Sequence, residues 1–101
     1  MRTGKAPRLG DVLPGVLAGL GAGEALRSVA AVAAWERVVG ERLGRFARAT
    51  GLRDGVLLVE AESSVWMQEI GYQKLRILKR LEEECGPGMV RDLKLVLRPA
   101  P

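Results

Sequence analysis

The sequence predicts an α+β domain in which helices pack on one face of a three-stranded sheet. Three observations lead to this class. Apolar residues recur at helical spacing in two long stretches, one around Trp35 and one around Ile77. An Asp54-Gly55 turn joins two apolar runs, which is typical of a β-hairpin. A third alternating run closes the chain, and a sheet covered by helices on one face buries all of these apolar stripes.

The length and charge of the chain set its broad class. A chain of 101 residues is long enough for one hydrophobic core. We expect a single domain over residues 9–98, after a flexible basic arm at 1–8 and before a short C-terminal end at 99–101. Sixteen Lys and Arg against twelve Asp and Glu give a net charge of +4, which favours polyanionic partners.

Two helices are predicted before the hairpin. Asp11 is a suitable N-cap for a first helix from Val12 to Leu20. The stretch from Glu24 to Val39 is rich in alanine, carries apolar residues at helical spacing and has few charges, so this second helix is expected to be largely buried. Gly40 suits the end of that helix, and residues 41–45 then add a short turn.

The two strands of the hairpin are predicted at residues 46–52 and 56–62. In the first strand, small residues alternate with Arg48 and Thr50, which are expected to point away from the helices. In the second strand, the residues expected to face the core are Leu57, Val59 and Ala61.

One long helix and one strand complete the chain. The helix is predicted to begin at Ser63 or Ser64 and to end at Gly86. Its apolar stripe consists of Trp66, Ile70, Ile77, Leu78 and Leu81. The last strand spans residues 90–98, and the residues expected to point inward are Leu93, Leu95 and Leu97. A crossover through the helix allows this strand to lie parallel to the second strand or beside the first.

The residue inventory argues against an enzyme. Histidine is absent and Cys85 is the only cysteine, so the sequence offers no Ser-His or Cys-His pair and no zinc cluster. The glycines at 19, 21 and 23 follow a helix and lack the lysine of a phosphate-binding loop. We therefore expect no catalytic residue, no metal, no cofactor and no small-molecule substrate. We expect a cytoplasmic protein with no membrane span.

Two groups of basic residues are candidates for contacts with nucleic-acid phosphates. The first group surrounds the entry into the hairpin and contains Arg42, Arg45, Arg48 and Arg53. The second group lies on the exposed side of the long helix and contains Arg76, Lys79 and Arg80. A solvated basic surface is the alternative, because neither group is interleaved with aromatic residues for base stacking. Trp35 and Trp66 lie in apolar helical stripes, which favours core roles for both.

The face of the sheet without helices offers a different kind of surface. Leu58 and Val96 are expected on that face, among charged side chains that include Lys94 and Arg98. An apolar spot inside a charged rim suits a protein partner. Scattered aliphatic residues on a surface are the simpler alternative.

Four short motifs, taken together with their order and spacing, resemble the DciA family of bacterial proteins. The motifs are Trp35-x-x-Val38-Val39-Gly40, Asp54-Gly55-Val56-Leu57-x-Val59, Ser63-Ser64-x-Trp66-x-x-Glu69-Ile70 and Leu93-x-Leu95. The resemblance spans about Leu9 to Leu97. It implies a KH-like α+β domain in the cytoplasm that binds the DnaB-type replicative helicase and helps to load it on single-stranded DNA.

The resemblance implies no catalytic residue, so the expected function is that of a non-enzymatic accessory protein of DNA replication. Its expected partners are the replicative helicase and, weakly, single-stranded DNA. KH domains hold nucleic acid with a Gly-x-x-Gly loop, whereas Gly40 and Gly44 are one residue too far apart and precede the first strand. A general KH-like nucleic-acid-binding domain and a protein-interaction scaffold without nucleic acid are the alternatives, and the oligomeric state stays open.

Overall fold

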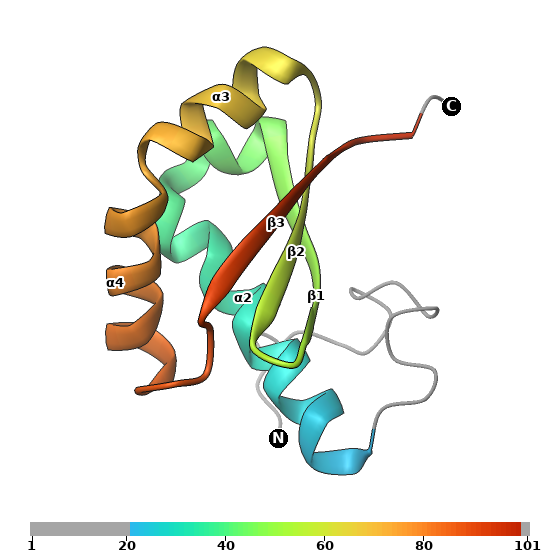
Figure 1. Cartoon of the computed structure of the whole chain (residues 1–101), viewed down its shortest axis with the longest axis vertical. Coiled ribbons are helices and arrows are strands. Elements are labelled where there is room, and N and C mark those ends of the chain that lie inside the picture. Colours follow the sequence, from blue (N-terminus) through green and yellow to red (C-terminus); the bar gives the residue numbers. More distant parts are fainter. Residues whose placement is uncertain (1–20, 100–101) are drawn as a thin grey trace.

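A computed structural model describes residues 21–99 of the chain. The elements in this range are α2 (Ala22–Phe46), β1 (Ala47–Arg53), β2 (Val56–Ala61), α3 (Ser64–Tyr72), α4 (Lys74–Cys85) and β3 (Asp92–Leu97), and Figure 1 shows their arrangement. This is the predicted α+β class and the predicted order, with one helix split in two. The predicted arm at 1–8 and the predicted helix from Val12 to Leu20 lie outside the described residues.

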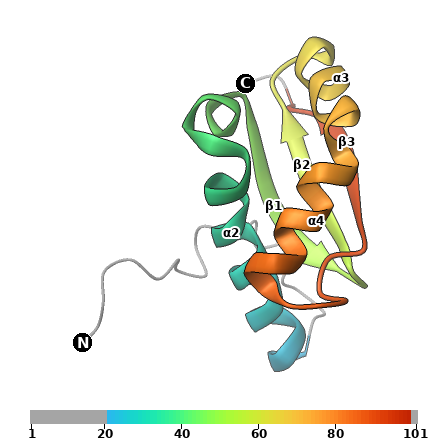
Figure 2. The same ribbon diagram turned by 90° about the vertical axis from the view of Figure 1, so that its left-hand side faces the viewer.

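The three strands form one sheet in the order β1-β2-β3. β1 pairs antiparallel with β2, and β3 pairs parallel with β2, which resolves the two placements that the sequence left open. Parallel neighbours need a long crossover, and α3 and α4 supply it. The helices lie on one face of the sheet, as predicted, and no other element of residues 21–99 covers the opposite face, which we call the open face (Figure 2).

α2 contains a sharp change of direction at Gly40. This residue has φ 91° and ψ 164°, a conformation outside the helical region that strains any residue with a Cβ atom. The chain then makes a short helical turn to Phe46 and enters β1 at Ala47. The predicted helix end at Gly40 and the short turn after it are therefore confirmed, and the kink brings β1 back along the face of α2.

The prediction of one long helix after the hairpin is wrong, because the helix breaks at Gln73. This residue has φ −99° and ψ 6°, and it separates α3 from α4. Gly71 precedes the break and is a poor helix former. The two pieces also pack on different elements: α3 lies over β2 and β3, whereas α4 lies mainly along α2. A change of direction at Gln73 lets the apolar stripe pack on the sheet in α3 and on α2 in α4.

The core lies between the helices and the sheet. The residues of β2 predicted to face inward, Leu57, Val59 and Ala61, are all fully buried. In β1 the register shifts between Ala49 and Gly51, so Thr50 is buried and does not point outward as predicted. After this bulge Leu52 pairs with Leu57 inside the core. In β3 the predicted inward direction holds for Leu93 and Leu97, whose partners on β2, Leu57 and Ala61, are buried, but Leu97 is still 54% exposed.

Side chains of α2 form hydrogen bonds with backbone groups of β1 and of the turn that follows it. The indole Nε1 of Trp35 donates a hydrogen bond to the carbonyl oxygen of Ala47 at 3.0 Å. The amide of Leu52 donates to the Oγ of Ser28 at 2.9 Å, and both groups are buried. At the turn of the hairpin, the amide of Asp54 donates to the Oε1 of Glu24 at 3.2 Å. These three bonds fix α2 to the start of β1, to the far part of β1 and to the turn that follows it.

Replacing Ser28 by alanine is expected to lower the free energy of unfolding by about 1–3 kcal/mol, because the buried amide of Leu52 then has no acceptor. Urea unfolding followed by far-UV circular dichroism measures this change. Ser63→Ala is the matched control, since Ser63 stands at the N-cap of α3 without a side-chain capping bond. Equal losses in the two variants would show that the Ser28 hydrogen bond has no special weight.

Candidate nucleic-acid and partner surfaces

The structure distributes the seven basic residues predicted for nucleic-acid binding over three places. Arg42 and Arg45 lie on the short turn that ends α2. Arg48 and Arg53 lie on β1, and Arg48 faces the open side of the sheet because its neighbours Ala47 and Ala49 are buried under the helices. The other three, Arg76, Lys79 and Arg80, lie on α4. The two predicted groups therefore do not form one continuous surface.

All seven of these residues are exposed, and none of them forms a salt bridge within residues 21–99. Four other cations of the same range are paired, whereas Arg91 and Lys94 form no salt bridge there. The bridges are Arg27 with Glu24, Arg37 with Glu84, Lys74 with Asp92, and Arg98 with Glu62. Most of the positive charge without a salt bridge in this range is therefore carried by the seven predicted residues, and the rest by Arg91 and Lys94.

The charges on α4 run against the dipole of the helix. Its first turn carries Lys74 and Arg76 and no acidic residue, while its last turn carries Glu82, Glu83 and Glu84 and no basic residue. A helix is stabilised by the opposite order, because its N-terminus carries partial positive charge. Lys74 is paired with Asp92, so the unpaired positive charge at this end of α4 comes from Arg76 and the positive end of the dipole, and Lys79 and Arg80 follow in the next turns. This end attracts anions, and the other end repels them.

Two exposed apolar side chains adjoin the basic end of α4. Tyr72 is 77% exposed and Leu75 is 82% exposed, on either side of the break at Gln73. The Oη of Tyr72 accepts a hydrogen bond from Gln68 at 2.9 Å, which holds the ring on the outer side of α3. An exposed aromatic ring beside unpaired cations is a suitable platform for a nucleobase. We call Tyr72, Leu75, Arg76, Lys79 and Arg80 the elbow surface.

Sequence reasoning missed the aromatic part of the elbow surface. The signal was available, because Tyr72 and Leu75 fall outside the apolar stripe that contains Ile70 and Ile77. Large apolar residues off the buried stripe of an amphipathic helix are candidates for contacts with a partner.

Trp35 and Trp66 have different environments. Trp35 is 2% exposed and belongs to the core, as predicted. Trp66 is only partly buried and packs against the core from its edge. Its ring stacks on Phe46 with centroids 4.4 Å apart and planes at 2°, and the guanidinium carbon of Arg42 lies 5.6 Å from the ring centroid of Trp66. This stack ties the end of α2 to the start of α3.

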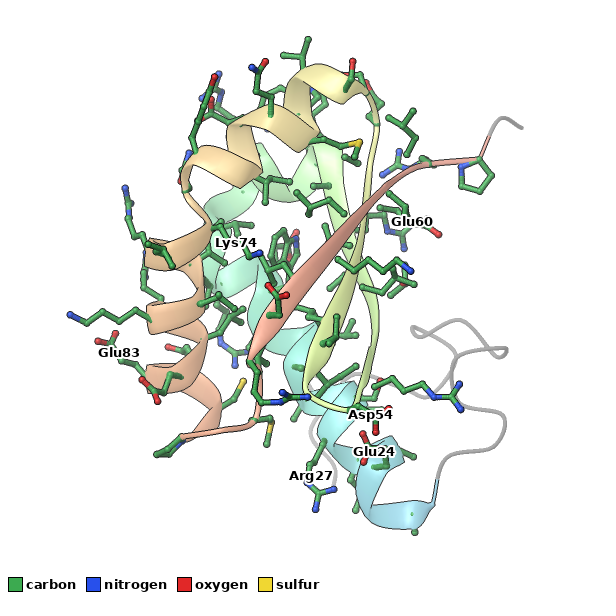
Figure 3. All side chains as sticks on the ribbon, in the orientation of Figure 1. Glu24, Arg27, Asp54, Glu60, Lys74 and Glu83 are labelled. Atoms are coloured by element: carbon green, nitrogen blue, oxygen red, sulfur yellow. The ribbon has the colours of Figure 1, made fainter. Side chains whose placement is uncertain are left out.

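The open face of the sheet carries the residues predicted for a protein partner. Leu58 pairs with Lys94 in neighbouring strands, and both Leu58 and Val96 are half-buried. Glu60 lies in register between Arg48 on β1 and Val96 on β3, and Figure 3 shows its side chain on the side away from the helices. Arg98 follows β3 at the edge of the sheet. The face thus has a small apolar centre with charges of both signs around it.

Two charged residues link the crossover helix to the edge of the sheet. The Nζ of Lys74 lies 2.6 Å from the Oδ1 of Asp92, and Figure 3 shows Lys74 reaching toward β3 while Glu83 points away from the sheet. The hydrogen bond from Lys74, with the amide of Leu93 as a second donor, lowers the pKa of Asp92. Asp92 therefore stays ionised at neutral pH and fixes the start of β3 to α4.

A cleft of about 470 Å³ lies between the hairpin turn and the loop after α4. Its charged lining residues bond to one another: Glu24 to Arg27 and to the amide of Asp54, and Arg91 to the carbonyl oxygen of Asp54. Burial raises the pKa of the Cys85 thiol in this cleft. The thiol is therefore protonated at neutral pH, which does not suit a nucleophile.

Within residues 21–99, no group of three or more Cys, Asp or Glu side chains has an arrangement that could hold a metal ion. In the same part of the chain, none of the helices has the length and apolar character that a membrane crossing requires.

Comparison with known proteins gives a family. The profile described as "Dna[CI] antecedent, DciA" matches residues 8–95. A UPF0232 protein of Rhodococcus jostii is 39% identical over 67 residues, which cover 66% of this chain and 36% of the relative. A UPF0232 protein of Mycobacterium tuberculosis is 37% identical over 67 residues, again 66% of this chain and 36% of the relative. The chain thus spans about a third of the length of these relatives, and over nearly all of its own length it belongs to the DciA family.

Proposed function

We propose that this chain is a non-enzymatic accessory domain of DNA replication, which binds the DnaB-type replicative helicase and weakly holds single-stranded DNA. Membership of the DciA family supports the role in replication. The observation that carries the DNA-binding part is the elbow surface, where unpaired cations, the positive end of α4 and the exposed ring of Tyr72 lie together. Phosphates contact the cations, and a base stacks on the ring.

The position of the elbow between two helices adds to this argument. KH domains clamp a nucleic-acid backbone with a Gly-x-x-Gly loop. Here the junction of α3 and α4 reads Gly71-Tyr72-Gln73-Lys74, so it keeps the first glycine and replaces the second by a lysine. We infer that the junction approaches the phosphate backbone at Gly71. The side chains that follow on α4 then supply the charge that a second glycine would not.

The open face of the sheet is the proposed contact for the helicase. Leu58 and Val96 form an apolar centre there, while Lys94 and Arg98 supply charges at one side. This surface lies on the side of the sheet opposite the helices that carry the elbow surface (Figure 2). Separate faces allow one domain to hold the helicase and the DNA strand at the same time. The mechanism is one of assembly, in which differential binding favours helicase states that admit DNA.

A pull-down with the cognate replicative helicase tests the partner. We expect the wild-type chain to be retained at micromolar concentration, and we expect Val96→Glu to lose retention because a charge replaces the apolar centre of the open face. Leu75→Glu is the matched control, since Leu75 is an exposed aliphatic residue on α4. Circular dichroism melting curves establish that both variants are folded.

The outcomes separate the alternatives. No retention of the wild-type chain, together with salt-dependent binding to single-stranded DNA, would favour a general nucleic-acid-binding domain. Retention of the wild-type chain without any DNA binding would favour a protein-interaction scaffold. Loss of retention in Leu75→Glu but not in Val96→Glu would move the helicase contact from the open face to the elbow surface.

A further inference from the structure

The two edge strands of the sheet differ in how many of their outward backbone groups are hydrogen-bonded. At the β1 edge, side chains of α2 bond to Ala47, Leu52 and Asp54. At the β3 edge, the hydrogen bonds of residues 21–99 include only one to an outward backbone group, from the amide of Leu93 to the Oδ1 of its neighbour Asp92. An edge strand that keeps unpaired amides and carbonyls is ready to pair with another strand.

The hydrogen bonds between β3 and β2 identify which amides and carbonyls of β3 point away from β2. The amide of Asp92 donates to Gly55 at 3.2 Å, and the amide of Arg98 donates to Ala61 at 2.7 Å. Both bonds point toward β2, and backbone direction alternates along a strand. The amides and carbonyls of Leu93, Leu95 and Leu97 therefore point away from β2, toward the free edge.

Two side chains at this edge lack the partners that their chemistry calls for. Leu97 is 54% exposed although it lies on the helix-covered side of the sheet, like the buried Leu93. The Nη2 of Arg98 is buried and has no hydrogen-bond partner among the described residues, and the Nη1 of Arg98 lies 3.9 Å from Glu62. A guanidinium nitrogen without an acceptor is costly to bury, so the Arg98 side chain gains if it turns toward an acceptor at the edge, and the exposed Leu97 lacks an apolar neighbour.

We propose that a second copy of this chain completes this edge, through antiparallel pairing of β3 with β3 of the partner about a two-fold axis at Leu95. In this register each copy of Leu95 faces the other, and Leu93 faces Leu97 of the second copy. These are the residues whose backbone groups point outward, so their amides and carbonyls can form hydrogen bonds with those of the second copy. The exposed Leu97 then lies beside an apolar residue.

Charge complementarity favours a second copy over another extended peptide. The same register places Asp92 opposite Arg98 of the second copy, twice in each dimer. Both contacts of Asp92 within residues 21–99 use Oδ1, and the side chain of Arg98 is 33% exposed, so its guanidinium can turn toward a partner. These two residues would meet at a pair of positions that do not exchange hydrogen bonds, where side chains are closest. A strand that carries complementary charges at its two ends is self-complementary, as a two-fold interface requires.

The pairing also has a defined consequence for the shape of the assembly. A two-fold axis through an antiparallel strand pair stands perpendicular to the sheet, so the helices of both copies lie on the same side. The product is one six-stranded sheet with a continuous open face. Pairing through a single edge buries little surface, so we expect a dimer that forms only at roughly tens of micromolar or above.

Sedimentation velocity over a range from about 5 to about 500 μM tests this proposal, since a weak dimer of this kind dissociates within the range. We expect the sedimentation coefficient of the wild-type chain to rise with concentration. Leu97→Lys is expected to abolish the rise, because a lysine on an edge strand opposes pairing. Circular dichroism melting curves verify that each variant is folded.

Charge reversal gives a sharper test of the register. In Asp92→Arg alone the facing charges are both positive, and in Arg98→Asp alone they are both negative, so each variant is expected to dimerise at least about tenfold more weakly than the wild-type chain. An equimolar mixture of the two variants restores both attractive pairs and is expected to form a heterodimer. Glu83→Arg and Arg80→Asp on α4 carry the same charge changes away from the edge and serve as matched controls.

Several results would overturn the proposal. A chain that stays monomeric over the whole range has no self-complementary edge, and its β3 is then free for a different partner. A dimer that Leu97→Lys and both charge reversals leave intact uses another surface. Failure of the mixed variants to associate, when Leu97→Lys also disrupts the dimer, would contradict the register centred on Leu95.

Discussion

Trp35→Ala is expected to lower the free energy of unfolding by about 3–5 kcal/mol, which is a large part of the stability of a domain of this size. Trp35 is 2% exposed, so its removal leaves a cavity between α2 and β1. The substitution also leaves the carbonyl oxygen of Ala47 without its donor at 3.0 Å. Urea unfolding followed by far-UV circular dichroism measures the loss and does not depend on tryptophan fluorescence.

Two further variants divide this effect into its parts. Trp35→Phe keeps much of the buried ring and loses the hydrogen bond to Ala47, so we expect a smaller loss of about 1–3 kcal/mol. Trp66→Ala removes a partly buried ring that stacks on Phe46, and it is expected to cost less than Trp35→Ala. A loss in Trp66→Ala as large as that in Trp35→Ala would show that the stack at the edge of the core is as important as the buried indole.

Local signals explain why much of this fold was predictable from the sequence. The Asp54-Gly55 turn needs backbone conformations with positive φ, and both residues adopt them, with φ of 52° and 80°. Gly40 likewise ends the main part of α2 with φ 91°. The alternation of Leu57, Val59 and Ala61 correctly predicts a strand with one buried face. Each of these features depends on a few residues that are close in the sequence.

Features that depend on distant contacts were not predictable in the same way. The break at Gln73 has no proline, and the apolar stripe on its two sides is compatible with one straight helix. It reflects packing of α3 on the sheet and of α4 on α2. The bulge that buries Thr50 and the parallel placement of β3 also depend on which strand lies alongside. Hydrophobic periodicity gives the face of an element but not its neighbour.

The candidate site was also predictable from the sequence only in part. Sequence reasoning nominated Arg76, Lys79 and Arg80 because they lie off the apolar stripe, and the structure places them together on the outer side of α4. It could not show that Arg42 and Arg48 belong to other surfaces, because that separation follows from the kink at Gly40 and the direction of β1. Nearness in the sequence is a poor guide to a common surface when a turn lies between.

Neutralising the basic end of α4 is expected to weaken binding of single-stranded DNA by at least about tenfold at low salt and to make the salt dependence less steep. The variant carries Arg76→Ala, Lys79→Ala and Arg80→Ala. Each phosphate contact contributes about 0.7 to the slope of log K against log salt for a single strand, so three contacts account for about 2. Fluorescence anisotropy with a labelled oligonucleotide at several salt concentrations measures both quantities.

The same variant is expected to be at least as stable as the wild-type chain, because Arg76 opposes the dipole in the first turn of α4 and alanine is a better helix former. Loss of binding with retained stability is what distinguishes a functional basic surface from a structural one. Glu82→Gln with Glu83→Gln gives the opposite change, and we expect tighter binding, since two repulsive charges are removed while the Glu84–Arg37 bridge at 3.1 Å is kept. Arg48→Ala with Arg53→Ala tests the sheet face. If that variant alone reduces the slope, the DNA strand runs over β1 and not over the elbow surface.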